Sequence, residues 1–375
     1  MRYIHERPDW PDFRWDLSVL AEPLAAVRYR QGLLLGRMST LGFYVRSEAG
    51  LAAMTTDVVK SSAIEGERLD VAQVRSSLAR RLGLEMAGMV PSGRNVDGVV
   101  EMMLDATQHY DEPLTVDRLC GWHSSLFPAG YGVSGRIVTG KWRTAESGLM
   151  QVVSGYIGRE KVHFEAPAAE RLDLEMRRFL EWFNAPLSID PILRAGVAHL
   201  WFVTIHPFED GNGRIARAIA DCALASADGC QQRFYSMSGQ IEHERKEYYS
   251  ILERTQKGCL DITHWLSWFV GCLGRALEAS DGMIASVLVK AGVWRHAGQY
   301  VLNGRQRTII NRLLDDFKGN LTSGKYAKLA KCSQDTALRD IKQLLEYGIL
   351  EQGDAGGRST HYVETQAVGG TNHAG

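Results

Sequence analysis

The segment from His206 to Arg217 brings a base, an acid, a glycine-containing turn and two arginines into twelve consecutive residues, His-Pro-Phe-Glu-Asp-Gly-Asn-Gly-Arg-Ile-Ala-Arg. The stretch before it, residues 194–205, carries apolar side chains at helical spacing and predicts a buried helix. Pro207 disfavours helical geometry at His206, so we expect the imidazole at the helix end, facing the loop. A histidine in that place can take a proton from a hydroxyl.

The turn after the acid predicts an anion site. Its Gly-Asn-Gly sequence, residues 211–213, tolerates positive φ, so that main-chain N–H groups can converge on a phosphate at the start of a helix near Arg214. Arg214 and Arg217 lie three residues apart on one helical face, where two guanidiniums can bind neighbouring phosphates. Asp210 can hold Mg²⁺ through one carboxylate while the phosphates of a nucleotide supply other ligands. Together these parts predict nucleotide chemistry at a phosphate-handling site.

Every position of the pattern H-x-F-x-[DE]-G-N-G-R-x-x-R is occupied, and on these residues the sequence resembles the Fic family. The resemblance implies transfer of AMP from ATP, with Mg²⁺, to a Ser, Thr or Tyr hydroxyl of a protein target. It implies that His206 is the general base, Asp210 the magnesium ligand and Phe208 a buried anchor for the loop. The nucleotide-binding residues that it implies here are Gly211, Asn212, Gly213, Arg214 and Arg217. In this pattern Arg214 would hold the β-phosphate side and Arg217 the γ-phosphate.

A second motif, Ser-Ser-Ala-Ile-Glu-Gly at residues 61–66, ends an apolar-periodic stretch. Gly66 suits the position after a helix, so the helix should stop there. A carboxylate in the last helical turn is disfavoured by roughly 0.3–1 kcal/mol, so we expect Glu65 to face a cation elsewhere. The motif resembles the inhibitory pattern [ST]-x-x-x-E-[GN] of many Fic domains, which implies an inhibitory role for Ser61, Glu65 and Gly66. In that pattern Glu65 pairs with Arg217 and opposes the γ-phosphate; an ordinary helix end is the alternative.

Between the two motifs, residues 150–155 and 161–164 alternate like two short strands around a polar turn at 156–160, which predicts a β-hairpin. In the Fic resemblance this hairpin corresponds to the flap, which aligns an extended target segment by strand pairing. An exposed hairpin without a role in target binding is the alternative.

Tyr248 and Tyr249 are the candidates for contact with the adenine, because an aromatic face stacks on a base at small entropy cost. A tyrosine pair at helical spacing also fits core and rim packing, and this alternative stays open. Downstream, Asp261 or Thr263 is expected to cap the next helix, which is a structural role.

The last block, residues 298–364, predicts helices over 306–317, 323–330 and 333–347, followed by a strand from Gly348 and a return through 361–363. Three helices and a hairpin predict a winged helix. The side chains that would face DNA are Gln334, Thr336, Arg339 and Lys342 on the third helix and Arg358 in the wing. A protein-docking or dimerisation module is the alternative.

Composition decides little about function. The 375 residues are 45% hydrophobic, and the net charge of −1 gives no overall attraction to nucleic acid or membranes. No apolar run reaches the length of a membrane span, the start of the chain lacks a signal-peptide core, and six cysteines without C-x-x-C spacing fit reduced thiols. We therefore expect a cytoplasmic protein. The predicted regions are an N-terminal helical region with the inhibitory motif (1–90), a Fic catalytic core (91–285), a winged-helix domain (298–364) and a flexible tail (365–375).

We predict a mainly α fold, with a Fic-type helical core, a β-hairpin flap, an N-terminal helical region and a C-terminal winged helix, in a self-inhibited protein adenylyltransferase. The alternatives are a DNA-binding regulator whose core senses nucleotide and an enzyme that removes AMP from a modified target. The intact His206 favours an enzyme, since a sensor needs the phosphate cradle but no base. The expected partner is a target protein, which includes the chain itself, and DNA or a second copy of the chain are further candidates.

Overall fold

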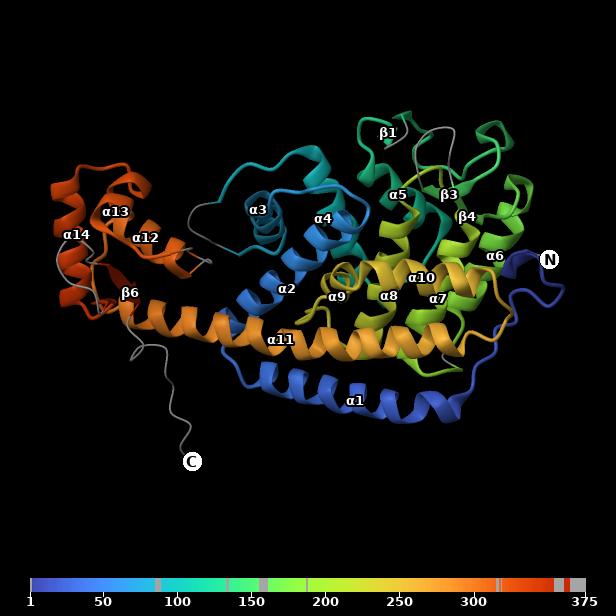
Figure 1. Cartoon of the computed structure of the whole chain (residues 1–375), viewed down its shortest axis with the longest axis horizontal. Coiled ribbons are helices and arrows are strands. Elements are labelled where there is room, and N and C mark those ends of the chain that lie inside the picture. Colours follow the sequence, from blue (N-terminus) through green and yellow to red (C-terminus); the bar gives the residue numbers. More distant parts are fainter. Residues whose placement is uncertain are drawn as a thin grey trace. The chain divides into compact units, whose positions relative to one another are not determined.

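The computed structural model describes residues 2–84, 89–132, 135–154, 161–186, 188–314, 317, 319–353 and 361–364. The predicted hairpin turn at 156–160, the wing residue Arg358 and the tail at 365–375 lie outside these residues. The described chain is mainly α-helical, and it divides into two compact units, Met1–Asp281 and Gly282–Gly375 (Figure 1). Each unit is described by itself.

The first unit holds most of the helices. Its helical elements are η1 (Ile4–Glu6), α1 (Leu17–Ser39), α2 (Phe43–Ile64), α3 (Val71–Arg81), α4 (Arg94–Gln108), α5 (Val116–Leu126), η2 (Ala145–Ser147), η3 (Ala169–Arg171), α6 (Leu172–Asn184), α7 (Pro191–Ile205), α8 (Asn212–Asp228), α9 (Met237–His243), α10 (Arg245–Gln256) and most of α11 (Thr263–Ala297). Its strands are β1 (Tyr131–Gly132), β2 (Gly135–Arg136), β3 (Gln151–Ser154) and β4 (Lys161–Glu165).

Helix α7 belongs to the first unit and packs along α8. It carries no charged side chain after Arg194, and its residues from Ala195 to Ile205 are all buried, as expected of a helix that is apolar on every face. Asp190 caps it by accepting from the main-chain N–H of Ile192 at 2.7 Å, and Pro191 stands in its first turn. The predicted helix over 194–205 is thus confirmed. None of the described helices is both long and apolar enough to cross a bilayer.

The N-terminal helices belong to the same unit as α7 and α8. Figure 1 shows α1 beside α11, and Arg37 on α1 pairs with Asp281 on α11 at 2.6 Å. Helix α11 starts where the sequence predicts, since Asp261 Oδ1 accepts from the main-chain N–H of Thr263 at 2.9 Å. The division after Asp281 falls inside this continuous helix, whereas the sequence placed the end of the core at 285 and the next domain at 298.

Strands β3 and β4 form an antiparallel hairpin in which Val152 pairs with Phe164 and Ser154 with Lys161. The ring of Phe164 is buried against Tyr3, edge to face at 5.2 Å, which anchors the hairpin to the start of the chain. These strands fall within one residue of the predicted bounds. Their assignment as a target-binding flap stays a prediction.

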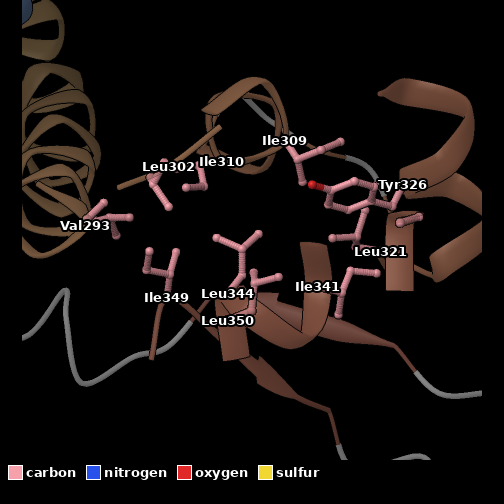
Figure 2. Close-up of a cluster of buried hydrophobic side chains, with 12 residues drawn as sticks. Val293, Leu302, Ile309, Ile310, Leu321, Tyr326, Ile341, Leu344, Ile349 and Leu350 are labelled. Atoms are coloured by element: carbon pink, nitrogen blue, oxygen red, sulfur yellow. The ribbon is translucent and has the colours of Figure 1, made fainter. Parts of the chain in front are cut away.

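The second unit contains three further helices and a hairpin: α12 (Gly304–Leu314), α13 (Ser323–Leu329), α14 (Gln334–Glu346), β5 (Leu350–Gln352) and β6 (Tyr362–Glu364). Figure 2 shows its core, where Ile309, Tyr326 and Leu344 are fully buried. Ser333 caps α14 by accepting from the main-chain N–H of Thr336. The order of elements matches the expected one. Its identity as a winged helix stays a prediction.

Candidate active site

The imidazole of His206 lies at the carboxyl end of α7, as the proline after it predicts. His206 itself has left-handed backbone angles, φ 53° and ψ 59°, which cost a non-glycine residue roughly 1–2 kcal/mol. Its Nδ1 lies 3.2 Å from the carbonyl oxygen of Val203. Because a carbonyl oxygen only accepts, Nδ1 must carry the hydrogen, and in the neutral ring Nε2 keeps its lone pair.

The environment of His206 keeps this ring neutral. Burial lowers the pKa of His206 to about 4, and the nearby Arg143 guanidinium acts in the same direction. The carboxylates of Glu65 and Asp210 raise it by less than these effects lower it. A ring that is neutral near physiological pH, with Nε2 unprotonated, can act as a general base.

The loop after His206 is closed by its own side chains. Asn212 Oδ1 accepts from the main-chain N–H of Phe208 at 2.9 Å, and Asn212 Nδ2 donates to the Phe208 carbonyl at 2.8 Å. The Phe208 ring is fully buried and stacks on His123 with 4.1 Å between ring centres. Phe208 is thus buried, as expected of an anchor for the loop. The Asn212 side chain is bound to the main chain of the loop itself. What Asn212 can offer a ligand is therefore its main chain.

The start of α8 forms the predicted turn, with Gly211 as N-cap in the left-handed region at φ 79°. A Cβ atom on Gly211 would lie 2.9 Å from the Phe127 ring, so both the angle and the space require glycine. Asp210 Oδ1 accepts from the main-chain N–H of Gly211 at 2.6 Å, which places a carboxylate beside the helix start. The helix begins at Asn212, two residues before the predicted Arg214, because Gly211 already caps it.

Arg217 makes the predicted pair with Glu65. Its Nη2 lies 2.8 Å from Glu65 Oε1 and donates to the carbonyl of Ser61 at 2.8 Å, while its Nε donates to Ser61 Oγ at 2.9 Å. The arginine is only 2% exposed. Burial opposes its charge, but the Glu65 carboxylate and neighbouring tyrosines leave the pKa of Arg217 above its ordinary value. Ser61 and Glu65 of the second motif therefore both bind the last arginine of the first.

Arg214 has a carboxylate partner that the sequence did not predict. Its Nη1 donates to Glu67 Oε2 at 2.6 Å, and the Arg214 side chain is 5% exposed. Gly66, at φ 88°, turns the chain after α2, and the main-chain N–H of Glu67 returns to the Ser62 carbonyl at 3.0 Å. This helix-ending geometry brings both acidic residues of the turn to the start of α8. Glu67, the acidic residue directly after Gly66, was the feature of the sequence that could have suggested this second ion pair.

The Glu65 carboxylate also covers the predicted anion cradle. A Cβ atom added to Gly213 would collide with Glu65 Oε1 and lie 3.3 Å from Arg217 Nη1. Glu65 Oε1 is therefore held above the first turn of α8, where main-chain N–H groups and the positive end of the helix dipole favour an anion. An internal carboxylate occupies the place expected for a phosphate.

The two candidate adenine residues lie in different environments. Tyr248 is 1% exposed, and its hydroxyl lies 2.9 Å from His199 Nε2. Tyr249 keeps an exposed fraction of 37%, and its hydroxyl donates to the carbonyl of Ile64 at the end of α2. Of the two, only Tyr249 has a ring that a ligand could reach without repacking.

A magnesium ion fits this site only as a partner of a nucleotide. Among the described residues, no three His, Cys, Asp or Glu side chains gather as a metal site. Asp210 supplies one carboxylate at the start of α8. Mg²⁺ is commonly held by one or two carboxylates together with substrate phosphates, so Asp210 suits that arrangement.

Two segments of the chain match known families. Residues 113–224 match the Fic/DOC family, and residues 3–84 match a domain of unknown function, DUF4172. The first segment contains the whole stretch 206–217. The second segment contains Glu65 and Glu67.

Proteins named as adenylyltransferases are among the similar sequences. The chain is 29% identical over 206 residues to protein adenylyltransferase fic-1 of Caenorhabditis elegans, which is 54% of this chain and 37% of that protein. It is 28% identical over 224 residues to protein adenylyltransferase Fic of Culex quinquefasciatus, which is 59% of this chain and 40% of that protein. The chain thus spans about two fifths of the length of these curated relatives.

A solved structure shares the fold. The crystal structure of a Fic family protein from Desulfovibrio desulfuricans G20 matches with a TM-score of 0.53, over 92% of this chain and 96% of that one, at 19% identity. At this identity the likeness concerns the fold alone.

Proposed function

We propose that the protein transfers AMP from ATP to a Ser, Thr or Tyr hydroxyl of a protein target, and that its resting site is closed by its own carboxylates. One observation carries the proposal. A neutral imidazole, His206, and two buried arginines, Arg214 and Arg217, meet at the junction of α7 and α8. The likeness to proteins named protein adenylyltransferase over 54% and 59% of this chain supports the same activity.

In the proposed reaction the target hydroxyl gives its proton to His206 Nε2 as its oxygen attacks the α-phosphorus of ATP. The new oxygen–phosphorus bond forms as the bond from the α-phosphorus to pyrophosphate breaks. Pyrophosphate leaves with the electron pair of that bond and so gains negative charge. Main-chain N–H groups of residues 211–213 and the two arginines stabilise this charge. Mg²⁺, held by Asp210 and the phosphates, would neutralise part of the phosphate charge.

The proposed resting state follows from the two ion pairs. The β- and γ-phosphates need Arg214 and Arg217, yet these side chains already bind Glu67 and Glu65. A phosphate that entered beside Glu65 would meet a like charge at the same arginine, which opposes binding. ATP can therefore reach its reactive pose only after the turn at residues 65–67 moves.

The remaining assignments concern the adenine and the target. We assign the adenine contact to Tyr249, whose ring stays reachable, and give Tyr248 the supporting role of packing beside Arg217. The hairpin β3–β4 is the candidate surface for an extended target segment, because an exposed strand edge offers main-chain hydrogen bonds. The six cysteines are all free thiols, which is compatible with the cytoplasmic setting that the sequence predicts.

A second candidate function concerns the second unit. Gln334, Arg339 and Lys342 on α14 are exposed, as a helix that contacts DNA requires. Two cations on one short helix support weak contact with phosphates. We therefore keep DNA as a candidate ligand of α14, beside a role of this unit in docking a protein or a second copy of the chain.

The test of the main proposal follows label from α-labelled ATP, with Mg²⁺, into the protein itself and into a cell lysate. We expect little label with the wild type, clear label with Glu65→Gly and none with Glu65→Gly/His206→Ala. Glu112→Gly, an exposed loop glutamate changed in the same way, serves as the control and should resemble the wild type. Equal labelling by wild type and Glu65→Gly would overturn the inhibitory role. Absence of label in every form, with ATP bound, would favour AMP removal or nucleotide sensing.

Stability offers a separate measurement on the same variants. Removing one partner of a fully buried pair costs about 3–5 kcal/mol. Glu65 is 30% exposed, so its loss should cost less than this, although it leaves the Arg217 charge buried without its carboxylate. Glu65→Gly should therefore lower the melting temperature, and ATP should raise it more than in the wild type. An unchanged response to ATP would argue against Glu65 as the group that opposes the nucleotide.

A further inference from the structure

Arg143 reaches the catalytic histidine from a segment that the sequence motifs do not include. It lies between β2 and β3 and is 3% exposed. Its Nε donates to the carbonyl oxygen of His206 at 2.8 Å, and its Nη2 lies 3.5 Å from that of Ile205. Its main-chain N–H donates to the Pro207 carbonyl at 2.9 Å. One arginine thus contacts the last residue of α7, the base and the residue after it.

The same guanidinium also holds the far end of the hairpin. Arg143 Nη2 donates to the carbonyl of Pro167 at 2.5 Å, and Pro167 follows β4 by two residues. Arg143 itself precedes β3 by eight residues. The chain that enters the hairpin and the chain that leaves it are therefore both tied to the end of α7 by one side chain.

The chemistry of these contacts suits a cation. The last carbonyl groups of a helix have no intrahelical partner and lie at the negative end of its dipole. A planar guanidinium can donate to several such oxygens at fixed angles, which an ammonium group cannot do. Arg143 therefore stabilises the main-chain conformation in which His206 departs from the helix.

The position of the imidazole depends on that conformation. His206 has left-handed backbone angles, and Nδ1 of its ring contacts the Val203 carbonyl oxygen. The main chain that carries the ring is held by Arg143. Loss of the contact between Arg143 and the His206 carbonyl would let the main chain relax. His206 Nε2 would then move away from the hydroxyl that it must deprotonate.

We propose that Arg143 is a positioning residue of this active site. It holds the main chain of His206 and fixes the position of the base relative to the hairpin β3–β4. The inference rests on the proposed function in that His206 is taken as the base. It assigns to Arg143 no contact with the nucleotide. Arg143 should therefore affect the rate of transfer and leave nucleotide affinity unchanged.

The test uses the full chain with Glu65→Gly, so that transfer is measurable, and adds Arg143→Met or Arg143→Lys. Misplacement of a catalytic group by about 1 Å can cost about 100-fold in rate. We expect Arg143→Met to lower kcat by about 30- to 100-fold at an unchanged KM for ATP, and Arg143→Lys to lower it by less. Arg177→Gln, an exposed arginine on α6, is the control and should keep the rate. A higher KM at unchanged kcat, or an unchanged rate in both variants, would overturn the proposal.

Histidine NMR separates this test from the proposed activity, because it needs no transfer. With the His206 signal assigned by its loss in His206→Ala, a pH titration reports the pKa of His206 in each variant. Arg143→Met removes a nearby cation, so the pKa of His206 should rise. Arg143→Lys retains the charge, so it should shift the His206 resonance with little change in the pKa of His206. An unchanged His206 resonance and pKa in folded Arg143→Met would overturn the positioning role even if no variant transfers AMP. A normal His206 response without transfer would instead count against the proposed function alone.

Discussion

Basic side chains on α8 and on α14 lie in opposite environments. Arg214 and Arg217 on α8 are both buried, and each binds a carboxylate of the turn after α2. Arg339 and Lys342 on α14 are exposed to solvent. A buried charge depends on its particular partner, whereas an exposed charge is screened by water and salt. Single substitutions should therefore have large effects at the start of α8 and small effects on α14, and four experiments test this contrast.

The largest effect is expected from Gly213→Ala in the Glu65→Gly background. The added methyl group would occupy the space above the first turn of α8, which in the proposed reaction a phosphate enters. Transfer should fall by about 100-fold or more, as when one group that stabilises the developing charge is lost. The rate of label incorporation measures the effect. Gly36→Ala on α1, where an added Cβ meets nothing within 4 Å, is the control. A rate within twofold of the parent would show that phosphate does not approach Gly213.

The pH profile of transfer tests the lowered pKa of His206. A general base must be unprotonated, and burial lowers the pKa of His206 to about 4. In the Glu65→Gly background the rate should stay level from neutral pH to about 5 and fall about tenfold per unit below about 4. Loss of Glu65 removes an effect that raises this pKa, so the midpoint should not move upward. A midpoint near the ordinary value of 6.5, in protein shown to remain folded, would contradict the assigned environment.

A smaller effect is expected from Glu67→Gln in the same background. Glu67 is 36% exposed, so its pair with Arg214 is partly solvated and should contribute less than about 1 kcal/mol. Its loss should tighten ATP binding by about two- to fivefold, measured by calorimetry. Glu101→Gln, an exposed glutamate on α4, controls for the change in net charge. Weaker binding of ATP in Glu67→Gln would show that Glu67 supports the nucleotide site and does not oppose it.

The smallest effect is expected from Lys342→Ala on α14. If this face contacts a short DNA duplex, loss of one phosphate contact should weaken binding a few-fold and reduce the slope of log affinity against log salt by about one. Fluorescence anisotropy at several salt concentrations measures both. Arg30→Ala on α1 is the control. Wild-type protein that fails to bind the duplex would remove DNA from the candidate ligands of α14.

Local chemistry was predictable because local interactions decide it. Pro207 predicted the end of α7, and Gly66 predicted the end of α2, since each acts through the backbone of its immediate neighbours. The partner of Arg217 was also identified from the sequence, through the resemblance of the second motif to an inhibitory pattern. The distinction between Tyr248 and Tyr249 was not predictable, because helical spacing alone does not say which ring faces the core.

The sequence by itself therefore determined the residue types that the proposed proton transfer and phosphate binding require, and the turn that presents them within twelve residues. Only the tertiary structure decided the partners of Arg214 and of the His206 main chain. Glu67 and Arg214 lie 147 positions apart, and Arg143 and His206 lie 63 apart, so the chain must fold before either contact can form. Such pairs form when whole helices pack and bury an arginine. A buried guanidinium without an acceptor would cost several kcal/mol, so it binds the carboxylate or carbonyl oxygen that the packing brings near.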